Sequence, residues 1–400
     1  MKNAVEILTS HNKFHIALGL ERILAVANLL DNPQENYKIF HIAGTNGKGS
    51  TSKIINEILI ESGFKVGLFT SPHLFSYNER IQVNNEKIDE KVFDKLINEI
   101  DDLAKKNNIE LSEFELITAV AFYYFDKQKV DYVVLEVGLG GLYDATNIIK
   151  KSTSIITTLD FDHTERLGKT LDEIAFQKAG IIKENSNVVI SPDNKGYETI
   201  EKIATQKNAK ILDLPKVEVV FEDKNYAIID GIKYEFNLLG EYQAKNLALA
   251  LGALQNLNIK KEVLEKALKK VTWRFRLEYD KEKNILIDAG HNPSGIQTLR
   301  NFLDKNFKNK RKTFIFGCLK NKEYEKMLDI LIRDEDEFYF YEFDYPNALK
   351  FEQLPKKYNA KKLESLENIK DISNLKIFCG SIYMLGKIFS SPALNNYYEN

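Results

Sequence analysis

Short apolar runs alternate with longer amphipathic segments through the first half of the chain. Runs typical of buried strands occupy residues 37–42, 65–70, 131–137, 153–159 and 187–190. Most of the segments between them space their apolar residues as a helix does. This alternation predicts an α/β fold with a mainly parallel sheet, because parallel strands need crossover connections that are usually helices.

The pattern changes twice farther along the chain. Residues 210–236 hold closely spaced β-like pieces separated by turn residues, which predict a small antiparallel appendage, and residues 242–257 are typical of a helix. Strand-like runs then return, each beside helical sequence, and they begin at residues 284, 312, 338 and 375. A second α/β unit is therefore expected at the end of the chain.

The length of the chain bounds the number of domains. A chain of 400 residues is too long for one ordinary hydrophobic core and suits two domains. We place the hinge in the polar segment 279–284, which gives domains of residues 1–280 and 281–400.

The segment that follows the first strand-like run, HIAGTNGKGSTSK, suggests a phosphate-binding loop. It departs from the usual pattern G-x-x-x-x-G-K-[ST] in two places, because Ile42 stands where glycine is expected and Gly49 where Ser or Thr is expected. Three glycines, Gly44, Gly47 and Gly49, allow backbone N–H groups to point at an anion, and Lys48 adds a charge for the β- and γ-phosphates.

A helix is expected directly after this loop. Ile54, Ile55, Ile58 and Leu59 share one helical face, and Gly63 suits the end of the helix. Strand, glycine loop and helix are the context that a phosphate loop requires. In such loops the hydroxyl of the Ser or Thr after the lysine normally holds Mg²⁺. This chain has no hydroxyl at that position, so a bound metal would need other ligands.

Three candidate metal ligands follow neighbouring strand-like runs. They are Ser71, Glu136 and His163. Each has an ordinary structural explanation when taken alone: a turn residue, half of an ion pair, and a hydrogen-bonded loop histidine. Because ligands gather outside the carboxyl ends of parallel strands, the three side chains together with Lys48 suggest a site for a hard cation that bridges phosphates.

Composition narrows the class of protein. The formal net charge is −2 with both signs interspersed, which argues against a nucleic-acid partner. The first apolar patch is too short for a signal peptide, and no apolar run approaches membrane-spanning length. Cys318 and Cys379 lie inside strand-like runs, which disfavours a disulfide framework or a cysteine zinc site. We expect a cytoplasmic monomer that acts on small molecules without nucleic-acid or membrane partners.

Eight motifs in one order make the chain resemble a known family. The chain is similar over nearly its whole length to folylpolyglutamate synthases and dihydrofolate synthases, which are relatives of the Mur peptide ligases. The motifs are LGLERI, HIAGTNGKGS, FTSPHLFSYNERI, LEVGLGGLYDATN, LDFDHTERLG, QKAGIIK, WRFRLE and DAGHNP.

The resemblance implies an architecture and a reaction. A Mur-ligase-like P-loop domain would precede a Rossmann-like domain, with ATP in the cleft between them. The implied enzyme is an ATP-dependent acid–amino-acid ligase. It would activate the carboxylate of dihydropteroate or of a reduced folate as an acyl phosphate, and the amine of L-glutamate would then form the amide.

The resemblance also implies the roles of particular residues. Ser71, Glu136 and His163 match magnesium ligands, and Lys178 matches a lysine whose carbamate helps to hold a second Mg²⁺, although an exposed helical lysine is the ordinary alternative. The catalytic residues implied are Lys48, Lys178 and His291, the last near the γ-phosphate. The implied nucleotide contacts are Gly44, Thr45, Asn46, Gly47, Lys48, Gly49, Ser50, Asn246 at the adenine, Arg276 at the phosphates and Asp288 at the ribose.

The acceptor site rests mainly on the resemblance. The resemblance implies that Ile16, Ala17 and Leu18 lie against the pterin. Ser112 and Phe114 suit a polar contact and a stacking face, and Asp144 suits a hydrogen bond to the ring system or to the reacting carboxylate. Leu142 and Tyr143 complete the substrate candidates. Two departures from the family pattern affect substrate detail. Leu142 stands where an arginine is expected, and the segment Trp273–Arg276 reads WRFR rather than WPGR, so that Arg274 competes for the role of Arg276.

Two other functions remain open at the level of sequence. One is a Mur-type ligase that acts on another acceptor such as a UDP-sugar peptide, although only 43 residues precede Gly44, too few for the nucleotide-sugar domain that such enzymes usually carry. The other is a nucleotide-binding module without ligase chemistry, which would release ADP independently of glutamate.

Overall fold

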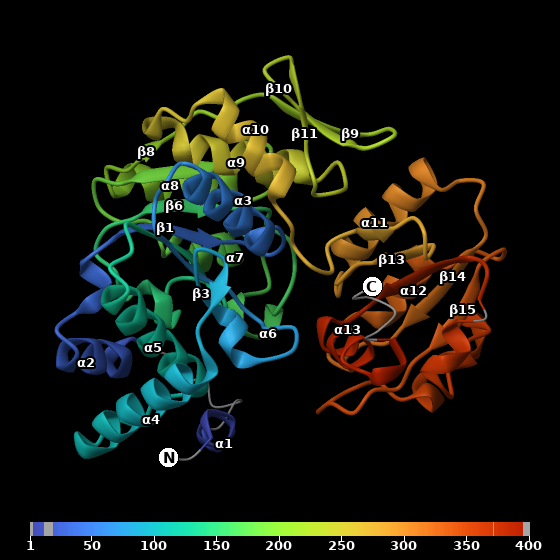
Figure 1. The fold of residues 1–400 in the computed structure, drawn as a ribbon, viewed down its shortest axis with the longest axis horizontal. Helices are drawn as coiled ribbons and strands as arrows, with labels where there is room; N and C mark the ends of the chain where they lie inside the picture. Colours follow the sequence, from blue (N-terminus) through green and yellow to red (C-terminus); the bar gives the residue numbers. More distant parts are fainter. Residues whose placement is uncertain (1–2, 12–18, 371, 395–400) are drawn as a thin grey trace. The chain divides into compact units, whose positions relative to one another are not determined.

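The computed structural model describes residues 3–11, 19–370 and 372–394 (Figure 1). The chain divides into two compact units. The first unit comprises Met1–Glu218, Ala227–Phe236 and Gln243–Val271, and the second comprises Val219–Tyr226, Asn237–Tyr242 and Thr272–Asn400.

An eight-stranded sheet forms the centre of the first unit, in the order β4-β3-β2-β5-β1-β6-β7-β8. β1 lies parallel to β5 and β6, β2 to β5, β6 to β7 and β7 to β8, whereas β3 is antiparallel to β2 and β4. The strands are β1 (Lys38–Ala43), β2 (Val66–Phe69), β3 (Ile81–Val83), β4 (Glu86–Lys87), β5 (Tyr132–Glu136), β6 (Thr153–Ile156), β7 (Asn187–Ile190) and β8 (Lys210–Ile211).

The prediction of a mainly parallel α/β sheet is confirmed. The five apolar runs predicted as strands are β1, β2, β5, β6 and β7. β3 and β4 escaped prediction because they are only three and two residues long, too short for a strand pattern to stand out. Lys210–Ile211 was wrongly placed in the appendage, since it pairs with β7 as the last strand of the main sheet.

Helices surround this sheet. They are α1 (Ala4–Ser10), α2 (Glu21–Leu29), α3 (Lys48–Glu61), α4 (Glu90–Lys106), α5 (Glu113–Lys127), α6 (Thr164–Leu167), α7 (Leu171–Ala179), α8 (Tyr197–Gln206), α9 (Gln243–Leu254) and α10 (Lys261–Lys270), with 3₁₀ turns η1 (Pro33–Glu35), η2 (Tyr77–Arg80), η3 (Ala145–Ile148) and η4 (Gln255–Leu257). α2, α4 and α5 lie on one side of the sheet and α3, α9 and α10 on the other (Figure 1). Central strands therefore read as continuous apolar runs, because both of their faces are covered.

The helix after the glycine loop forms as predicted. Ile54, Ile55, Ile58 and Leu59 of α3 are fully buried, and burial of each such side chain stabilises the fold by about 1.5–3 kcal/mol. Gly63 follows the helix with φ of 90°, the left-handed conformation that glycine adopts without a steric penalty.

The predicted appendage is a three-stranded sheet in the order β11-β10-β9. Its strands are β9 (Val217–Phe221), β10 (Asn225–Ile229) and β11 (Ile232–Glu235). Their links are so short that neighbouring strands must run antiparallel. The predicted helix follows as α9.

The second unit contains a six-stranded sheet in the order β12-β13-β17-β14-β15-β16, parallel except for β12. Its strands are β12 (Glu278–Asp280), β13 (Ile285–Ile287), β14 (Lys312–Phe316), β15 (Glu337–Phe340), β16 (Lys361–Lys362) and β17 (Leu375–Cys379). Its helices are α11 (Pro293–Asn306), α12 (Tyr324–Leu331), α13 (Ile382–Phe389), η5 (Phe351–Gln353), η6 (Lys356–Tyr358) and η7 (Leu366–Ile369). The predicted second α/β unit is therefore present.

The segment 279–284, suggested as a hinge, belongs to a hairpin in which β12 pairs antiparallel with β13. The compact units divide at Val271 and Thr272. Domains of residues 1–280 and 281–400 remain a prediction. Within the described ranges, no helix is both long and apolar enough to cross a membrane.

Candidate functional site

The carboxyl ends of four strands meet at one edge of the first sheet. In the strand register Ile42 of β1 lies beside Glu136 of β5 and Ile155 of β6, and Phe69 of β2 lies beside Leu135. The loops that carry the predicted phosphate and metal residues therefore start side by side. This is the edge at which open parallel sheets bind ligands.

The loop after β1 has a backbone that only glycine can adopt at two positions. Gly44 has φ of 155° and Gly47 has φ of 90°. A Cβ atom on Gly44 would lie 1.7 Å from Thr157 Oγ1, and one on Gly47 would lie 2.4 Å from Asn246 Oδ1. The third predicted loop glycine, Gly49, instead lies in the first turn of α3.

Hydrogen bonds tie this loop to the segment after β6. Thr45 N donates to the carbonyl of Thr158 at 2.8 Å, and Thr45 Oγ1 donates to the carbonyl of Asp160 at 3.0 Å. The hydroxyls of Thr157 and Thr158 both donate to the carbonyl of Asn46, at 2.7 and 3.0 Å. The glycine loop is therefore held in shape before any ligand binds. Sequence reasoning missed Thr157 and Thr158, although both stand next to the quoted motif LDFDHTERLG.

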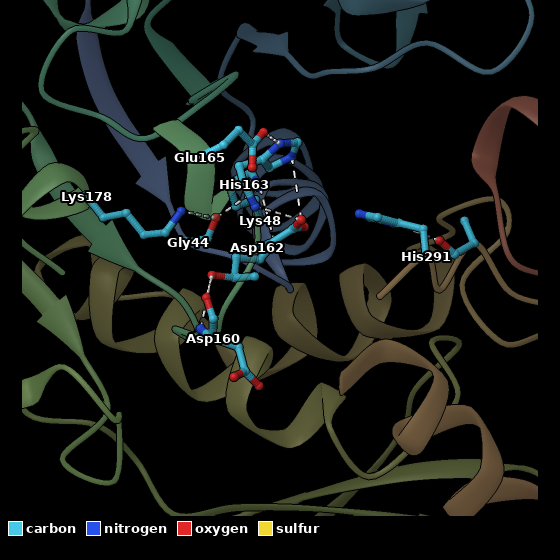
Figure 2. A network of polar contacts seen from close by, with 10 residues as sticks. Gly44, Lys48, Asp160, Asp162, His163, Glu165, Lys178 and His291 are labelled. Carbon is cyan, nitrogen blue, oxygen red and sulfur yellow. Dashed lines mark hydrogen bonds and ion pairs between the residues drawn. The ribbon is translucent and has the colours of Figure 1, made fainter. Parts of the chain in front are cut away.

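Two lysine ammonium groups converge on one carbonyl of the loop (Figure 2). Lys48 Nζ donates to Gly44 O at 3.1 Å and to Thr45 O at 3.4 Å, and Lys178 Nζ donates to Gly44 O at 3.0 Å. An anion placed here would be attracted by Lys48 and by the protonated fraction of Lys178.

Lys178 is not the exposed helical lysine of the ordinary alternative. It lies in the last turn of α7 and is only 4% exposed. Burial, reinforced by the nearby charge of Lys48, lowers its pKa to about 7, although Asp162 and Asp144 oppose the shift. A substantial fraction of this amine is therefore neutral near pH 7.

The three predicted metal ligands are placed differently. Glu136 is buried at the end of β5, and Ser71 N donates to its Oε2 at 3.4 Å, so these two residues lie together. His163 precedes α6 with φ of 51°. Its ring lies 3.8 Å from both Asp162 Oδ1 and Glu165 Oε1 (Figure 2).

Sequence reasoning did not assign Asp162 and Glu165, which flank the histidine in the motif DFDHTER. Among the described residues, no group of three or more His, Cys, Asp or Glu side chains that could hold a metal is found. The structure thus brings Ser71 and Glu136 together and surrounds His163 with carboxylates.

The first turn of α9 covers the loop from the other side. Asn246 is buried, and its Nδ2 donates to Gln243 Oε1 at 2.7 Å. Gln243 Nε2 lies 3.5 Å from the hydroxyl of Ser50 in α3. These contacts hold the Asn246 carboxamide against Gly47, beside the predicted nucleotide site.

Two of the predicted acceptor residues, Ser112 and Phe114, lie at the start of α5. The Ser112 hydroxyl accepts from Glu115 N at 3.3 Å, and Glu115 Oε2 accepts from Ser112 N at 2.8 Å, so Ser112 caps α5. The Phe114 ring packs against Gly138, where a Cβ atom would lie 2.6 Å from the ring. Residues 16–18, Ile16, Ala17 and Leu18, lie outside the described residues.

The loop after β5 carries the other acceptor candidates. Leu142 N donates to the carbonyl of Gln177 in α7 at 2.8 Å, which ties the loop to the helix of Lys178. Tyr143 is 50% exposed. Asp144 is buried, and its carboxylate accepts from Leu139 N at 2.9 Å and from Thr146 N at 3.0 Å. Burial raises the pKa of Asp144, and these hydrogen bonds oppose the shift.

The second unit holds the remaining candidates at the end of β13. Asp288 is buried and accepts from Leu277 N at 3.0 Å and from Gly290 N at 2.8 Å. Burial raises its pKa, and the charge of Arg276 is the largest opposing influence. His291 Nδ1 donates to the carbonyl of Ala289 at 3.1 Å, because a carbonyl can only accept.

The WRFR departure has a local explanation. Phe275 is fully buried with φ of 61° and contacts the ring of Phe389, with centroids 5.4 Å apart. Arg276 is half-buried and its charge acts on the Asp288 carboxyl, whereas Arg274 is exposed. This placement favours Arg276 over Arg274 for the predicted role.

Comparison with family models identifies both parts of the chain. Residues 42–254 match the Mur ligase middle domain, and residues 272–376 match the C-terminal domain of dihydrofolate synthetase. The dihydrofolate synthase/folylpolyglutamate synthase of Bacillus subtilis is 32% identical, covering 94% of this chain and 95% of the relative. The dihydrofolate synthetase of Saccharomyces cerevisiae is 31% identical, covering 93% and 97%.

Solved structures give the same picture. Folylpolyglutamate synthase of Mycobacterium tuberculosis, complexed with ADP and AMPPCP, has a TM-score of 0.85 at 26% identity and covers 99% of both chains. E. coli FolC in complex with DHPP and ADP has a TM-score of 0.84 at 26% identity, covering 97% of both. The bifunctional enzyme of Yersinia pestis, with AMPPNP and Mn, has a TM-score of 0.84 at 27% identity, covering 98% of both.

The lowered pKa of Lys178 predicts a pH-dependent stability. The unfolded chain binds more protons than the folded chain between the folded pKa of about 7 and the usual value of 10.5, so stability rises with pH through that window. Lys178→Met should therefore be more stable than wild type at pH 6, by up to roughly 4–5 kcal/mol, and this advantage should shrink as the pH approaches 10.

Urea unfolding in buffer free of carbon dioxide measures this difference. Lys95→Met is the matched control, because it makes the same substitution at a side chain that is 62% exposed. A constant difference for Lys178→Met would contradict the lowered pKa.

Proposed function

The chain belongs to the dihydrofolate synthase/folylpolyglutamate synthase family of ATP-dependent glutamate ligases, and we propose that it joins L-glutamate to a pterin acceptor. The acceptor is dihydropteroate or a reduced folate, whose carboxylate is activated as an acyl phosphate. The observation that carries the proposal is the convergence of Lys48 and Lys178 on the carbonyl of Gly44. Lys48 supplies the positive charge that a phosphate loop needs, and Lys178 beside it is the partly neutral amine that we propose to be carbamylated.

The residues at this edge fit Mg-ATP. The glycine loop leaves no room for a Cβ atom at Gly44 or Gly47, Lys48 supplies positive charge, and Glu136 supplies a buried carboxylate. We assign Ser71, Glu136 and His163 to one Mg²⁺ and a carbamate on Lys178 to a second. When bound, the ions neutralise phosphate charge and align the reacting oxygens.

The chain itself contributes mainly positioning and charge. Lys48 is held by two carbonyls at the start of α3, where the free N–H groups of the helix also favour an anion. We assign Arg276 to the phosphates of the nucleotide, Asp288 to its ribose and His291 to the neighbourhood of the γ-phosphate. Because phosphoryl transfer and amide formation proceed through the acceptor carboxylate and the glutamate amine, no nucleophilic side chain of the protein is required.

Carbamylation of Lys178 is supported by its environment. Only a neutral amine can add carbon dioxide, and the pKa of about 7 leaves much of this amine neutral at physiological pH. Conversion of a buried cation into an anion would also remove its repulsion by Lys48.

Dihydropteroate is the more secure acceptor. The Phe114 ring at Gly138 gives a flat heteroaromatic ring an apolar wall. Because Leu142 stands where an arginine is expected, the site lacks a positive charge that would suit the additional carboxylates of a folate tail. We also propose that the enzyme is a monomer and acts in the cytoplasm.

The central prediction concerns the acceptor. Purified protein supplied with Mg-ATP should release ADP only when L-glutamate and a pterin acceptor are both present, strongly with dihydropteroate and less with a reduced folate monoglutamate. UDP-sugar peptides should give none. ADP release that ignores glutamate would favour a nucleotide-binding module. Bound Mg-ATP without ligation to either pterin would refute the proposed substrate class.

Lys48→Ala and Glu136→Ala should each lower glutamate-dependent ADP release by at least about a thousandfold, because they remove charge at the phosphates and the metal. The circular dichroism spectrum of each variant should stay unchanged. Glu57→Ala is the matched control, since Glu57 is also a buried carboxylate but bonds Asn85 Nδ2 at 2.9 Å, away from the loop. Near-normal turnover by Glu136→Ala would exclude the metal assignment.

Lys178→Ala should be severely impaired and partly rescued by a small carboxylic acid, because the proposed ligand is the added carboxylate rather than the amine. Rescue is measured as turnover against acetate or formate concentration, with chloride at equal ionic strength as the control. Intact-mass and crystallographic evidence for an unmodified lysine in the active enzyme would rule out the carbamate.

A further inference from the structure

A buried chain of hydrogen bonds connects β1 to the loop of residues 137–147, named here the 137–147 loop. His41 Nε2 lies 2.8 Å from Thr146 Oγ1, and Thr146 Oγ1 lies 2.5 Å from Asp144 Oδ1. His41 and Thr146 are fully buried, and Asp144 is 6% exposed. None of these contacts belongs to the phosphate loop or to the assigned metal ligands.

The atoms that carry protons decide which group donates each hydrogen bond between His41, Thr146 and Asp144. A carboxylate can only accept, so the single hydroxyl proton of Thr146 points to Asp144. Thr146 Oγ1 must then accept from His41, which places the imidazole proton on Nε2. His41 Nδ1 has no hydrogen-bond partner within the described residues, in agreement with an unprotonated nitrogen there.

The imidazole stays neutral in this position. Burial, followed by the charge of Lys183, holds the pKa of His41 well below its usual range. The histidine therefore acts as a fixed donor whose tautomer is set by Thr146, and the polarity of the whole chain is defined.

The hydrogen-bond chain ends at the Asp144 carboxylate, which shapes the 137–147 loop. Asp144 Oδ1 accepts from both the hydroxyl and the backbone N–H of Thr146, and Oδ2 accepts from Leu139 N. Rotation of this carboxylate would break contacts on both sides of the glycine turn. The hydroxyl of Thr146 thus fixes an acid that stands next to Leu142 and Tyr143.

A second, independent attachment holds the far end of the loop. Asn147 Nδ2 donates to the carbonyls of Leu142 and Gly180, at 3.0 and 3.1 Å, and Lys183 Nζ donates to Asn147 Oδ1 at 2.8 Å. The loop therefore remains attached to α7 when the His41 chain is cut. Loss of the chain should change the orientation of Asp144 rather than unfold the loop.

We propose that His41 and Thr146 are positioning residues, which hold Asp144 and the 137–147 loop in the shape needed to bind the acceptor. The inference rests on the proposed function for the identity of that acceptor. The phosphate loop is held separately by Thr157 and Thr158. The two residues should therefore influence the acceptor without influencing ATP.

Thr146→Val tests this separation, because it keeps the shape and the backbone N–H but removes the hydroxyl. It should raise the KM for dihydropteroate by about tenfold to a hundredfold, as expected for a lost hydrogen bond to a buried carboxylate, and should change the KM for Mg-ATP by less than about twofold. Thr146→Ser should restore the acceptor KM. An unchanged acceptor KM, or an equal rise in both constants, would overturn the proposal.

Thr313→Val is the matched control. Thr313 is a fully buried threonine of β14 whose hydroxyl lies 3.4 Å from Glu337 Oε2, so the same chemistry is removed in the second unit. Both KM values should stay at wild-type levels in this variant. His41→Phe should reproduce the acceptor effect of Thr146→Val, and the double variant should be no worse than either single variant. Additive losses would contradict a single chain.

Nitrogen-15 NMR of the imidazole separates this inference from the proposed function. His41 should show the neutral tautomer with the proton on Nε2 from pH 6 to pH 8 in the wild-type protein, whichever substrate is used. A proton on Nδ1, or a charged ring at pH 6.5, would overturn the chain itself. A wild-type protein with the expected tautomer but no glutamate-dependent ADP release would refute only the proposed function.

Discussion

The close approach of Gly44 to Thr157 is the constraint on which the rest of the candidate site depends. A Cβ atom at Gly44 would lie 1.7 Å from the threonine hydroxyl, so the loop after β1 can meet the segment after β6 only as glycine. In the loop packed this way, the carbonyl of Gly44 accepts from both Lys48 and Lys178. The backbone carbonyl, rather than an acidic side chain, is therefore the group on which the two lysines converge.

This pair of lysines is costly to maintain without an anion. Lys178 is almost wholly buried and lies close enough to Lys48 for the second charge to lower its pKa further. Burial of a cation is unfavourable unless a partner offsets the lost hydration. The lowered pKa of Lys178 reduces this cost, because the neutral amine needs no partner charge.

The 137–147 loop connects the parts of the site that differ in chemistry. It follows Glu136 of β5, packs Gly138 on the Phe114 ring, and ends at Asn147, which donates to the carbonyls of Leu142 and Gly180. The 137–147 loop thus links the metal-ligand candidate Glu136 to the acceptor candidates and to the helix that carries Lys178. Its internal polar contacts are buried, so its shape depends on satisfied hydrogen bonds rather than on apolar area.

The sequence alone determined the strand runs, the helix face of α3, the two α/β units and the position of the glycine loop, because each is a local pattern of polarity or chain flexibility. The family motifs added the reaction. The burial of Lys178, the short edge strands and the pairing of Lys210–Ile211 with β7 were decided only by the tertiary structure. The use of Ser112 as a helix cap, by contrast, is local, and the Ser-x-x-Glu spacing of Ser112 and Glu115 is enough to predict it. The tertiary features depend on which segments meet across the sheet, and burial and pKa arise from neighbours that are distant in sequence.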